Sequence, residues 1–84
     1  MDEQALDIVS LVKTLVEPLV DYADELEIYS TETGDGTTLI EISANEEDAG
    51  KIIGRQGRVI KSIRTLARAA ASRTNAHVEV ELID

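Results

Sequence analysis

The sequence has no cysteine, no tryptophan and no phenylalanine, and it contains only one proline, one histidine and two tyrosines. Without cysteine the chain forms no disulfide, so a domain of 84 residues depends on helices and strands that pack well, or partly on a partner. Because 43% of the residues are hydrophobic and only 2% are aromatic, the core has to consist of isoleucine, leucine, valine and alanine. We therefore expect a single ordered domain over residues 1–84.

The same absences limit the chemistry that the chain can perform. With no cysteine and a single histidine, His77, a transition-metal site is not expected. His77 has no serine or carboxylate pattern around it that would position it as a general base, so we expect no catalytic residue, no enzyme and no cofactor. The chain begins with acidic residues where a secretory signal needs positive charge, and it has no apolar run as long as a membrane span. We expect a cytoplasmic protein with no membrane partner.

Acidic residues are missing from one stretch of an otherwise acidic chain. The formal net charge is -9, yet residues 51–73 contain seven basic residues and no aspartate or glutamate. This segment carries +7, and the other 61 residues carry -16. Basic charge gathered in one short segment predicts a site for a polyanion such as a nucleic acid. The acidic remainder should confine a bound strand to one groove, because it repels phosphates elsewhere.

Hydrophobic periodicity predicts the order helix, strand, strand, short helix, glycine loop, helix, strand. An amphipathic helix is expected from about residue 3 to residue 16, with Ala5 among its core-facing residues and Pro18 ending it. Two alternating segments joined by a turn at Gly34–Gly36 predict a β-hairpin. A longer helix is expected from about residue 57 to residue 73, with a basic face and an apolar face that includes Leu66, and a last strand should cover 77–83.

Asn45 is expected to cap the short helix that precedes the glycine loop. Three acidic residues, Glu46, Glu47 and Asp48, then lie in its first turn, where the helix dipole favours negative charge. This placement favours helix initiation over a metal or catalytic cluster.

Two glycines, Gly54 and Gly57, enclose the turn between the two helices. Glycine adopts positive φ at little cost and lets a ligand approach the backbone closely. We expect the amides of Gln56, Gly57 and Arg58 to point outward at the start of a helix and to form an anion site. The turn is not a P-loop, because the spacing G-x-x-x-x-G-K-S/T is absent. Gly50, one turn earlier, is expected to be a packing glycine.

The run IIGRQGRVIK, residues 52–61, resembles the I-G-x-x-G-x-x-I signature of KH domains, in which a GxxG loop holds about four nucleotides of single-stranded RNA or DNA. The element order resembles the type II KH arrangement, αββααβ, over the whole chain. This implies an α+β fold in which three helices pack on one face of a three-stranded sheet. The length and the phrase DAGKIIGRQGRVIKSIRTLARAAA are similar to the KhpA family of small bacterial proteins with a single KH domain.

The resemblance also implies an RNA-binding site at the loop and beside it, made of Ile52, Ile53, Gly54, Arg55, Gln56, Gly57, Arg58 and Lys61. One of the two isoleucines should line the groove and the other should lie in the core, and the sequence leaves open which. Arg64 and Arg68 extend the basic path or face solvent. In KH domains the strand beside the groove reads base edges, which here points to Glu41 through Ser43. Because no aromatic residue lies near the loop, stacking is not expected and specificity should be modest.

For function, the resemblance implies an RNA chaperone or post-transcriptional regulator that binds single-stranded RNA. It implies a homodimer, or a heterodimer with a KhpB-like KH-domain protein, and a role in cell elongation and peptidoglycan homeostasis. A second hypothesis stays open, in which the KH fold is a protein interaction or dimerisation module whose own RNA binding is weak or partner-dependent. The sequence does not choose between the first helix and the long last helix as the dimer contact.

Overall fold

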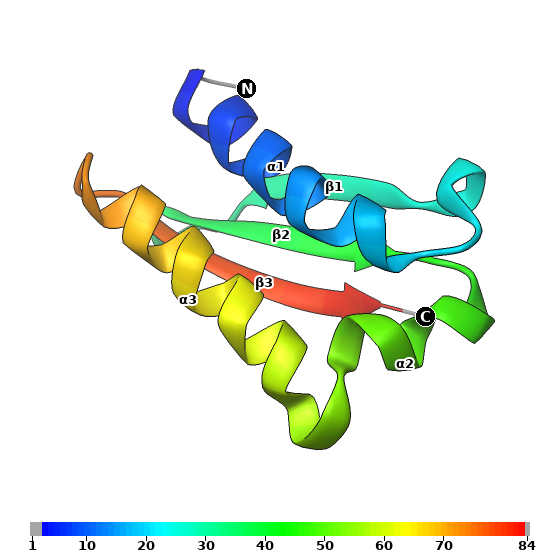
Figure 1. The fold of residues 1–84 in the computed structure, drawn as a ribbon. Coiled ribbons are helices and arrows are strands. Elements are labelled where there is room, and N and C mark those ends of the chain that lie inside the picture. The colour runs from blue at the N-terminus through cyan, green and yellow to red at the C-terminus, as the bar shows by residue number, and fades with distance from the viewer. Residues whose placement is uncertain (1–2, 84) are drawn as a thin grey trace.

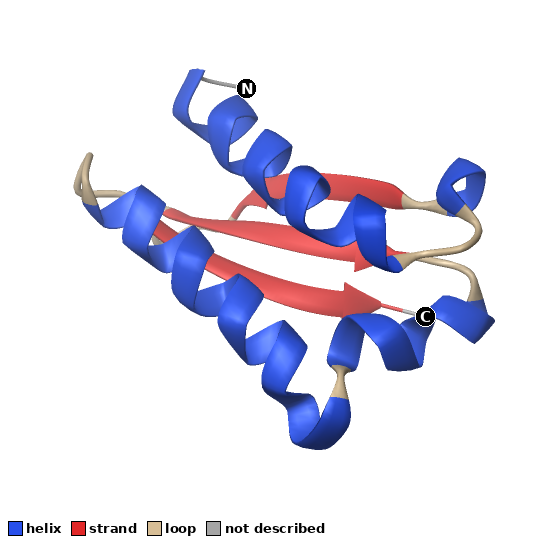
Figure 2. Cartoon of the chain, viewed as in Figure 1, coloured by secondary structure: helices blue, strands red, loops and turns tan. Residues whose placement is uncertain are grey.

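The computed structural model describes residues 3–83, and the side chains of residues 8–83. Six elements follow in the expected αββααβ order: α1 (Glu3–Val16), β1 (Glu27–Glu32), β2 (Thr37–Ser43), α2 (Glu46–Ile53), α3 (Arg58–Ser72) and β3 (His77–Ile83). Figure 1 shows α1 and α3 side by side over one face of the sheet, and Figure 2 shows the helical and sheet layers of this α+β fold. None of the helices formed by residues 3–83 combines the length and the apolar character that a bilayer span needs.

The sheet has the order β1-β2-β3 and is mixed. β1 and β2 form the expected antiparallel hairpin, in which Ile28 pairs with Ile42. β2 and β3 run parallel, with Ile40 opposite Val80. Parallel neighbours need a crossover connection, and α2 with α3 supplies it. β2 is therefore the central strand, and β3 is an edge strand that lies beside α3 (Figure 1).

The core lies between the sheet and the helices. The buried hydrophobic side chains of the described residues come from α1, α2, α3, β2 and β3: Ile8, Val12, Val16, Ile40, Ile42, Ile52, Ile60, Ile63, Ala67, Ala71, Val78 and Val80. As expected, no aromatic ring takes part. α1 ends at Val16, where Pro18 follows in a short 3₁₀ turn. Ala5, which was also predicted to face the core, lies outside the described side chains.

Leu66 departs from the predicted pattern. It was expected on the apolar face of α3, but its side chain is 48% exposed. The buried residues of this helix, such as Ile63 and Ala67, lie at the centre of that face, and Leu66 lies at its edge. The apolar arc of the sequence is therefore wider than the surface that the sheet covers.

Asp48 is completely buried and anchors α2 to the chain that follows α1. Its two carboxylate oxygens accept hydrogen bonds from the backbone amides of Asp21 and Tyr22, each at 3.0 Å, and Lys51 Nζ lies 3.3 Å away. The predicted cap is confirmed, since Asn45 Oδ1 accepts from the Glu47 amide at 2.8 Å. Asp48 therefore does more than favour helix initiation, because it joins segments 27 residues apart.

The hydrogen bonds of Asp48 set the sign of its pKa shift. Burial raises the pKa of the carboxyl, but the amides of Asp21 and Tyr22 and the ammonium of Lys51 lower it by more, so the pKa lies below its ordinary value. A carboxyl whose folded pKa is lowered adds stability above the ordinary carboxyl range. That contribution is lost as the pH falls through this range towards the folded pKa.

We expect Asp48→Asn to lower the urea midpoint of unfolding at about pH 7, because an amide NH₂ would face a backbone N–H donor in the buried site. The difference from the unchanged protein should shrink as the pH falls through the ordinary carboxyl range towards the folded pKa of Asp48. Circular dichroism during urea titration measures both midpoints. Glu47→Gln, a change at the exposed neighbour, is the control and should stay within about 0.5 kcal/mol. Equal midpoints for Asp48→Asn and the unchanged protein at neutral pH would contradict the anchoring role.

Candidate nucleic-acid interface

A tight turn, Arg55–Gly57, joins α2 to α3 at the expected GxxG position. Gly54 and Gly57 have φ of 76° and 75°, so both predicted glycine conformations are confirmed. Gln56 between them also has positive φ, 57°, which a residue with a side chain adopts at a cost of about 1–2 kcal/mol. The turn holds this conformation, and the side chains of Arg55 and Gln56 are exposed at its tip.

The two glycines are needed for different physical reasons. A Cβ at Gly54 would lie 2.3 Å from Val59 Cγ2 and 2.9 Å from the Val59 backbone nitrogen, so any side chain there would push the turn away from α3. A Cβ at Gly57 would meet only Lys61 Cε, at 3.8 Å. Glycine is therefore required at position 54 because packing leaves no room for a side chain. At position 57 it is favoured only because the backbone is left-handed. The space beside Gly57 remains accessible to a ligand.

The predicted site of three outward-pointing amides is wrong for two of them, those of Gly57 and Arg58. The Gly57 amide donates to the Gly54 carbonyl at 3.1 Å, and the Arg58 amide donates to the Arg55 carbonyl. The reason is that the turn is a 3₁₀ turn, which closes its own hydrogen bonds between residues three apart. Anion binding at this loop therefore depends mainly on basic side chains.

The structure separates the two isoleucines that precede the loop. Ile52 is completely buried in the core, whereas Ile53 is 41% exposed beside the turn. Ile53 is therefore the isoleucine that a bound strand can contact, and Ile52 anchors α2 in the core. Burial thus assigns Ile52 to the core, and contact between Ile53 and a bound strand stays a prediction.

Three of the seven basic residues in 51–73 already have partners inside the protein. Lys51 pairs with Asp21 and Asp48, and both partners raise its pKa although desolvation opposes them. Arg64 Nε donates to the Val80 carbonyl on β3 at 2.9 Å. Arg68 pairs with Glu79 on the same strand, with Nη2 2.8 Å from Oε2. Arg68 is therefore exposed but its charge is paired, whereas Arg64 donates to a neutral carbonyl and keeps its charge beside β3.

Three other basic residues, Arg55, Arg58 and Lys61, surround the loop. All three are exposed, and none forms an ion pair with a side chain in the described part of the chain. Arg58 Nη2 donates only to Gln56 Oε1, at 3.2 Å, a contact that keeps its charge uncompensated. Three uncompensated charges thus gather at the GxxG turn and on the first turns of α3, while Arg73, which is also exposed and forms no ion pair among the described side chains, lies at the opposite end of α3.

An apolar cavity of about 400 Å³ lies between α2 and the end of β3, lined by Ala44, Glu46, Ala49, Leu82 and Ile83. Gly50 and Ile53 follow on the same side of α2, one helical turn apart, and lead from this cavity to the loop. Gly50 was predicted to be a packing glycine, but a Cβ there would meet no atom within 4 Å. That prediction is wrong, because Gly50 is exposed on the side of α2 that leads to the loop.

The strand beside this groove is β3 and not β2. Glu41 through Ser43, which were expected to read base edges, belong to the central strand, where Glu41 lies between Tyr29 and Glu81. Leu82 and Ile83 line the groove instead. Strand order does not follow from periodicity alone. The parallel pairing of β3 with β2 places β3 at the edge of the sheet, beside α3 and next to the cavity that α2 lines.

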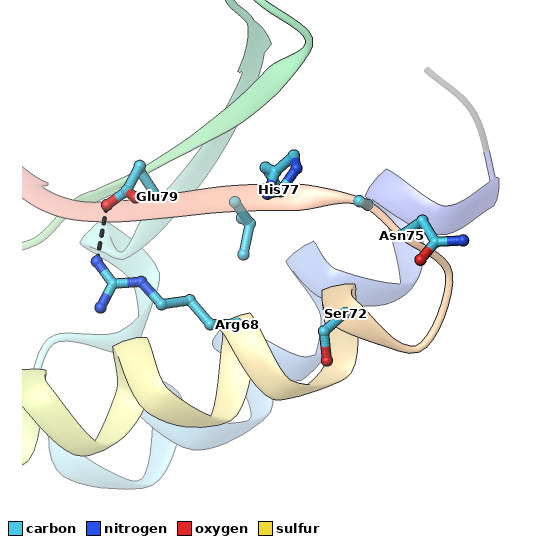
Figure 3. A pocket seen from close by; sticks show the side chains of 7 residues that line it. Arg68, Ser72, Asn75, His77 and Glu79 are labelled. Atoms are coloured by element: carbon cyan, nitrogen blue, oxygen red, sulfur yellow. Dashed lines mark hydrogen bonds and ion pairs between the residues drawn. The ribbon is translucent and has the colours of Figure 1, made fainter.

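A second cavity, of about 410 Å³, lies at the opposite end of α3 from the loop (Figure 3). Arg68, Ser72, Asn75, His77 and Glu79 are among its lining residues. Its arginine is already paired with Glu79, as the dashed line in Figure 3 marks, and the Ser72 hydroxyl donates to the Ala69 carbonyl. This cavity offers less uncompensated positive charge than the loop does.

The chain is similar to a known family. The model of the KhpA/KhpB KH domain matches residues 9–82. "RNA-binding protein KhpA" of Borreliella burgdorferi is 41% identical over 90% of this chain and 92% of that protein. The protein of the same name from Clostridium acetobutylicum is 44% identical over 87% of this chain and 96% of that protein. The one from Bacillus subtilis is 37% identical over the full length of both.

Solved structures share the fold at low identity. Era of Aquifex aeolicus superimposes with a TM-score of 0.65 and 18% identity, over 99% of this chain and 33% of the Era chain. Era in complex with MgGDPNP and nucleotides 1506–1542 of 16S ribosomal RNA gives 0.62 and 16%, over 98% of this chain and 32% of that chain. The chain thus spans about a third of each Era chain. The match of the family model to residues 9–82, and the relatives that are 37–44% identical along nearly all of the sequence, show that the chain belongs to the KhpA/KhpB KH domain family.

Proposed function

We propose that this protein binds single-stranded RNA, with phosphates at the GxxG turn and bases in the groove between α2 and β3. The observation that carries the proposal is that Arg55, Arg58 and Lys61 remain uncompensated around one turn of a chain with net charge -9. The relatives from three bacteria are named RNA-binding proteins, which supports the same ligand class for this chain.

Electrostatics confines the strand to this groove. Attraction between exposed charges extends over about 8–10 Å at physiological salt, so a phosphate is drawn in only near the loop. Over the rest of the surface the acidic excess repels it. The footprint should therefore be short, of about three or four phosphates, which agrees with the about four nucleotides that a GxxG loop holds.

Each predicted site residue has a distinct role in this proposal. Arg55 and Gln56 contact phosphates at the tip of the turn, and Gly54 and Gly57 shape the turn itself. Arg58 and Lys61 flank the phosphate path from the first turns of α3; Ile53 supports a base, and Ile52 holds α2 in place from the core. Contacts to bases are then apolar or made by hydrogen bonds, since no aromatic ring lines the groove.

The physiological part of the proposal follows from the family. We place the protein in the cytoplasm, as an RNA chaperone or post-transcriptional regulator that acts in cell elongation and peptidoglycan homeostasis. A homodimer, or a heterodimer with a KhpB-like KH-domain protein, is the proposed assembly. The family model covers the KH domains of both KhpA and KhpB, which supports a partner of the same fold.

The alternative function is a protein interaction module, and one observation favours it. Exposed Leu66 lies in an apolar patch on the side of α3 that faces α1, together with Leu15, Leu19, Val59 and Ile63. Exposed apolar patches often mark sites of interaction with another protein. Arg58 borders both this patch and the proposed phosphate path, so the two surfaces meet at the start of α3.

Reversing the charge of the loop should separate the two functions. We expect the double variant Arg55→Asp/Gln56→Asp to bind a short pyrimidine-rich RNA about tenfold more weakly or worse, because two carboxylates would lie where phosphates lie. Fluorescence anisotropy measures the affinity, and circular dichroism checks the fold. The matched control is Lys13→Asp/Thr14→Asp, which makes the same change of charge at exposed positions of α1.

If both double variants lose affinity equally, the effect comes from net charge and the loop is not the site. Unchanged RNA binding by the loop variant would favour the interaction module. Binding by neither the unchanged protein nor its variants would also favour that alternative, with a partner needed to complete the RNA surface.

Gly50→Ala tests the path along α2. The added methyl group meets no protein atom, so it should stabilise the helix by up to about 1 kcal/mol. The same methyl group would stand between Ile53 and the cavity, so RNA affinity should fall several-fold while thermal stability rises. Gly34→Ala in the hairpin turn, which is equally unhindered, is the control and should leave affinity unchanged. Full affinity in a stabilised Gly50→Ala protein would show that the strand does not follow this face.

A further inference from the structure

The groove between α2 and β3 contains one charged side chain where an RNA groove is expected to be apolar or basic. Its lining consists of half-buried apolar residues from the chain between β2 and α2, from α2 and from β3, and of Glu46. Ligand sites are mostly apolar, and the few polar groups in them set orientation and specificity. This inference rests on the proposed RNA binding, because it concerns which base the groove accepts.

The carboxylate of Glu46 has no cation to offset it. It forms no ion pair among the described side chains, and it lies on the first turn of α2, seven residues before Ile53. Seven residues of helix span roughly 10 Å, so the loop cations are about a Debye length away. The neighbouring amide of Asn45 is occupied, since its Nδ2 donates to Glu25 and its Oδ1 accepts from Glu47.

A carboxylate in this position repels any group that presents oxygen acceptors and attracts any group that presents N–H donors. Cytosine presents an amino group at N4 and adenine presents one at N6, whereas uracil presents a carbonyl oxygen at the equivalent place and its one ring N–H donor, at N3, lies between two carbonyl oxygens. Cytosine and uracil are otherwise nearly the same in size and shape. The groove therefore has a physical basis for telling them apart.

We propose that Glu46 is a specificity-determining residue, whose carboxylate accepts a hydrogen bond from the amino group of a base in the groove and excludes uracil. A negative charge in the groove lowers the affinity for every strand, because phosphates are near. For an amino-bearing base the charge-assisted hydrogen bond offsets that repulsion, and for uracil the bond from N3–H is weakened because the two flanking carbonyl oxygens are repelled by the carboxylate. Modest selectivity thus arises without any aromatic residue.

The test compares oligocytidine with oligouridine of the same short length, by fluorescence anisotropy at neutral pH. The unchanged protein should bind oligocytidine about five- to tenfold more tightly. Glu46→Ala should reduce this preference to near unity, mainly by strengthening the binding of oligouridine. Glu47→Ala is the matched control, because it removes a carboxylate from the same helical turn that does not line the groove. It should change both affinities by the same factor and keep the preference.

An absence of preference in the unchanged protein would overturn this inference, and so would a preference that survives Glu46→Ala. An equal loss of preference in both glutamate variants would also overturn it, because general charge would then be the cause. The loop variant Arg55→Asp/Gln56→Asp, measured in the same assay, distinguishes a failure of this inference from a failure of the proposed RNA binding. If that variant binds both oligomers as well as the unchanged protein does, the proposed function fails, and this inference fails with it.

Discussion

Lys51 and Arg68 form ion pairs with carboxylates of the protein itself, and this internal pairing determines which charge remains for a ligand. These pairs leave Arg55, Arg58 and Lys61 around a single turn without a carboxylate partner. Arg64, which donates to a neutral carbonyl, and Arg73, at the opposite end of α3, also keep their charge but lie farther from the turn. An acidic chain can therefore present a small, well-defined site for a polyanion. Exposed ion pairs contribute little to stability, so their main consequence here is the distribution of charge.

The shape of the turn depends on one close contact. Gly54 lies against Val59 with no room for a side chain, and this contact sets the direction in which α3 begins. Ile52 fixes the preceding helix in the core, and Asp48 ties that helix to the chain after α1. The turn is thus held from both sides before any ligand arrives. A site ordered in advance loses less conformational entropy on binding.

Local signals in the sequence predicted most of the fold. Pro18 ends α1, Asn45 caps α2, and the alternating segments form strands, because each of these effects acts within a few residues. The family and the lack of an enzymatic function are confirmed by the match to the KH domain model and by relatives named as RNA-binding proteins. Features that depend on residues far apart in the sequence could not be predicted from these local signals. Strand order, and with it the groove strand, depends on how the parallel crossover packs, and the buried anchor of Asp48 joins segments that periodicity cannot relate.

In the site, too, local features were predicted from the sequence and long-range features were not. The positive φ of both loop glycines follows from their spacing, but the use of the loop amides inside the turn does not, since it depends on the tight 3₁₀ geometry. Helical periodicity counted Arg64 and Arg68 on a basic face, yet it could not show that β3 lies within reach of both. The role of Gly50 was misjudged for a related reason. Sequence indicates that a glycine is present, and only the surrounding packing shows whether the missing side chain leaves room for protein or for a ligand.

The salt dependence of RNA binding tests most directly whether three cations form the site. Each phosphate neutralised on a single strand contributes about -0.7 to the slope of log K against log salt concentration. Three available cations therefore predict a slope of about -2 for a short RNA, and a fourth contact would bring it to about -3. A slope of about -5 would mean that all seven basic residues of 51–73 contact phosphates, and it would contradict the internal pairing on which the site depends.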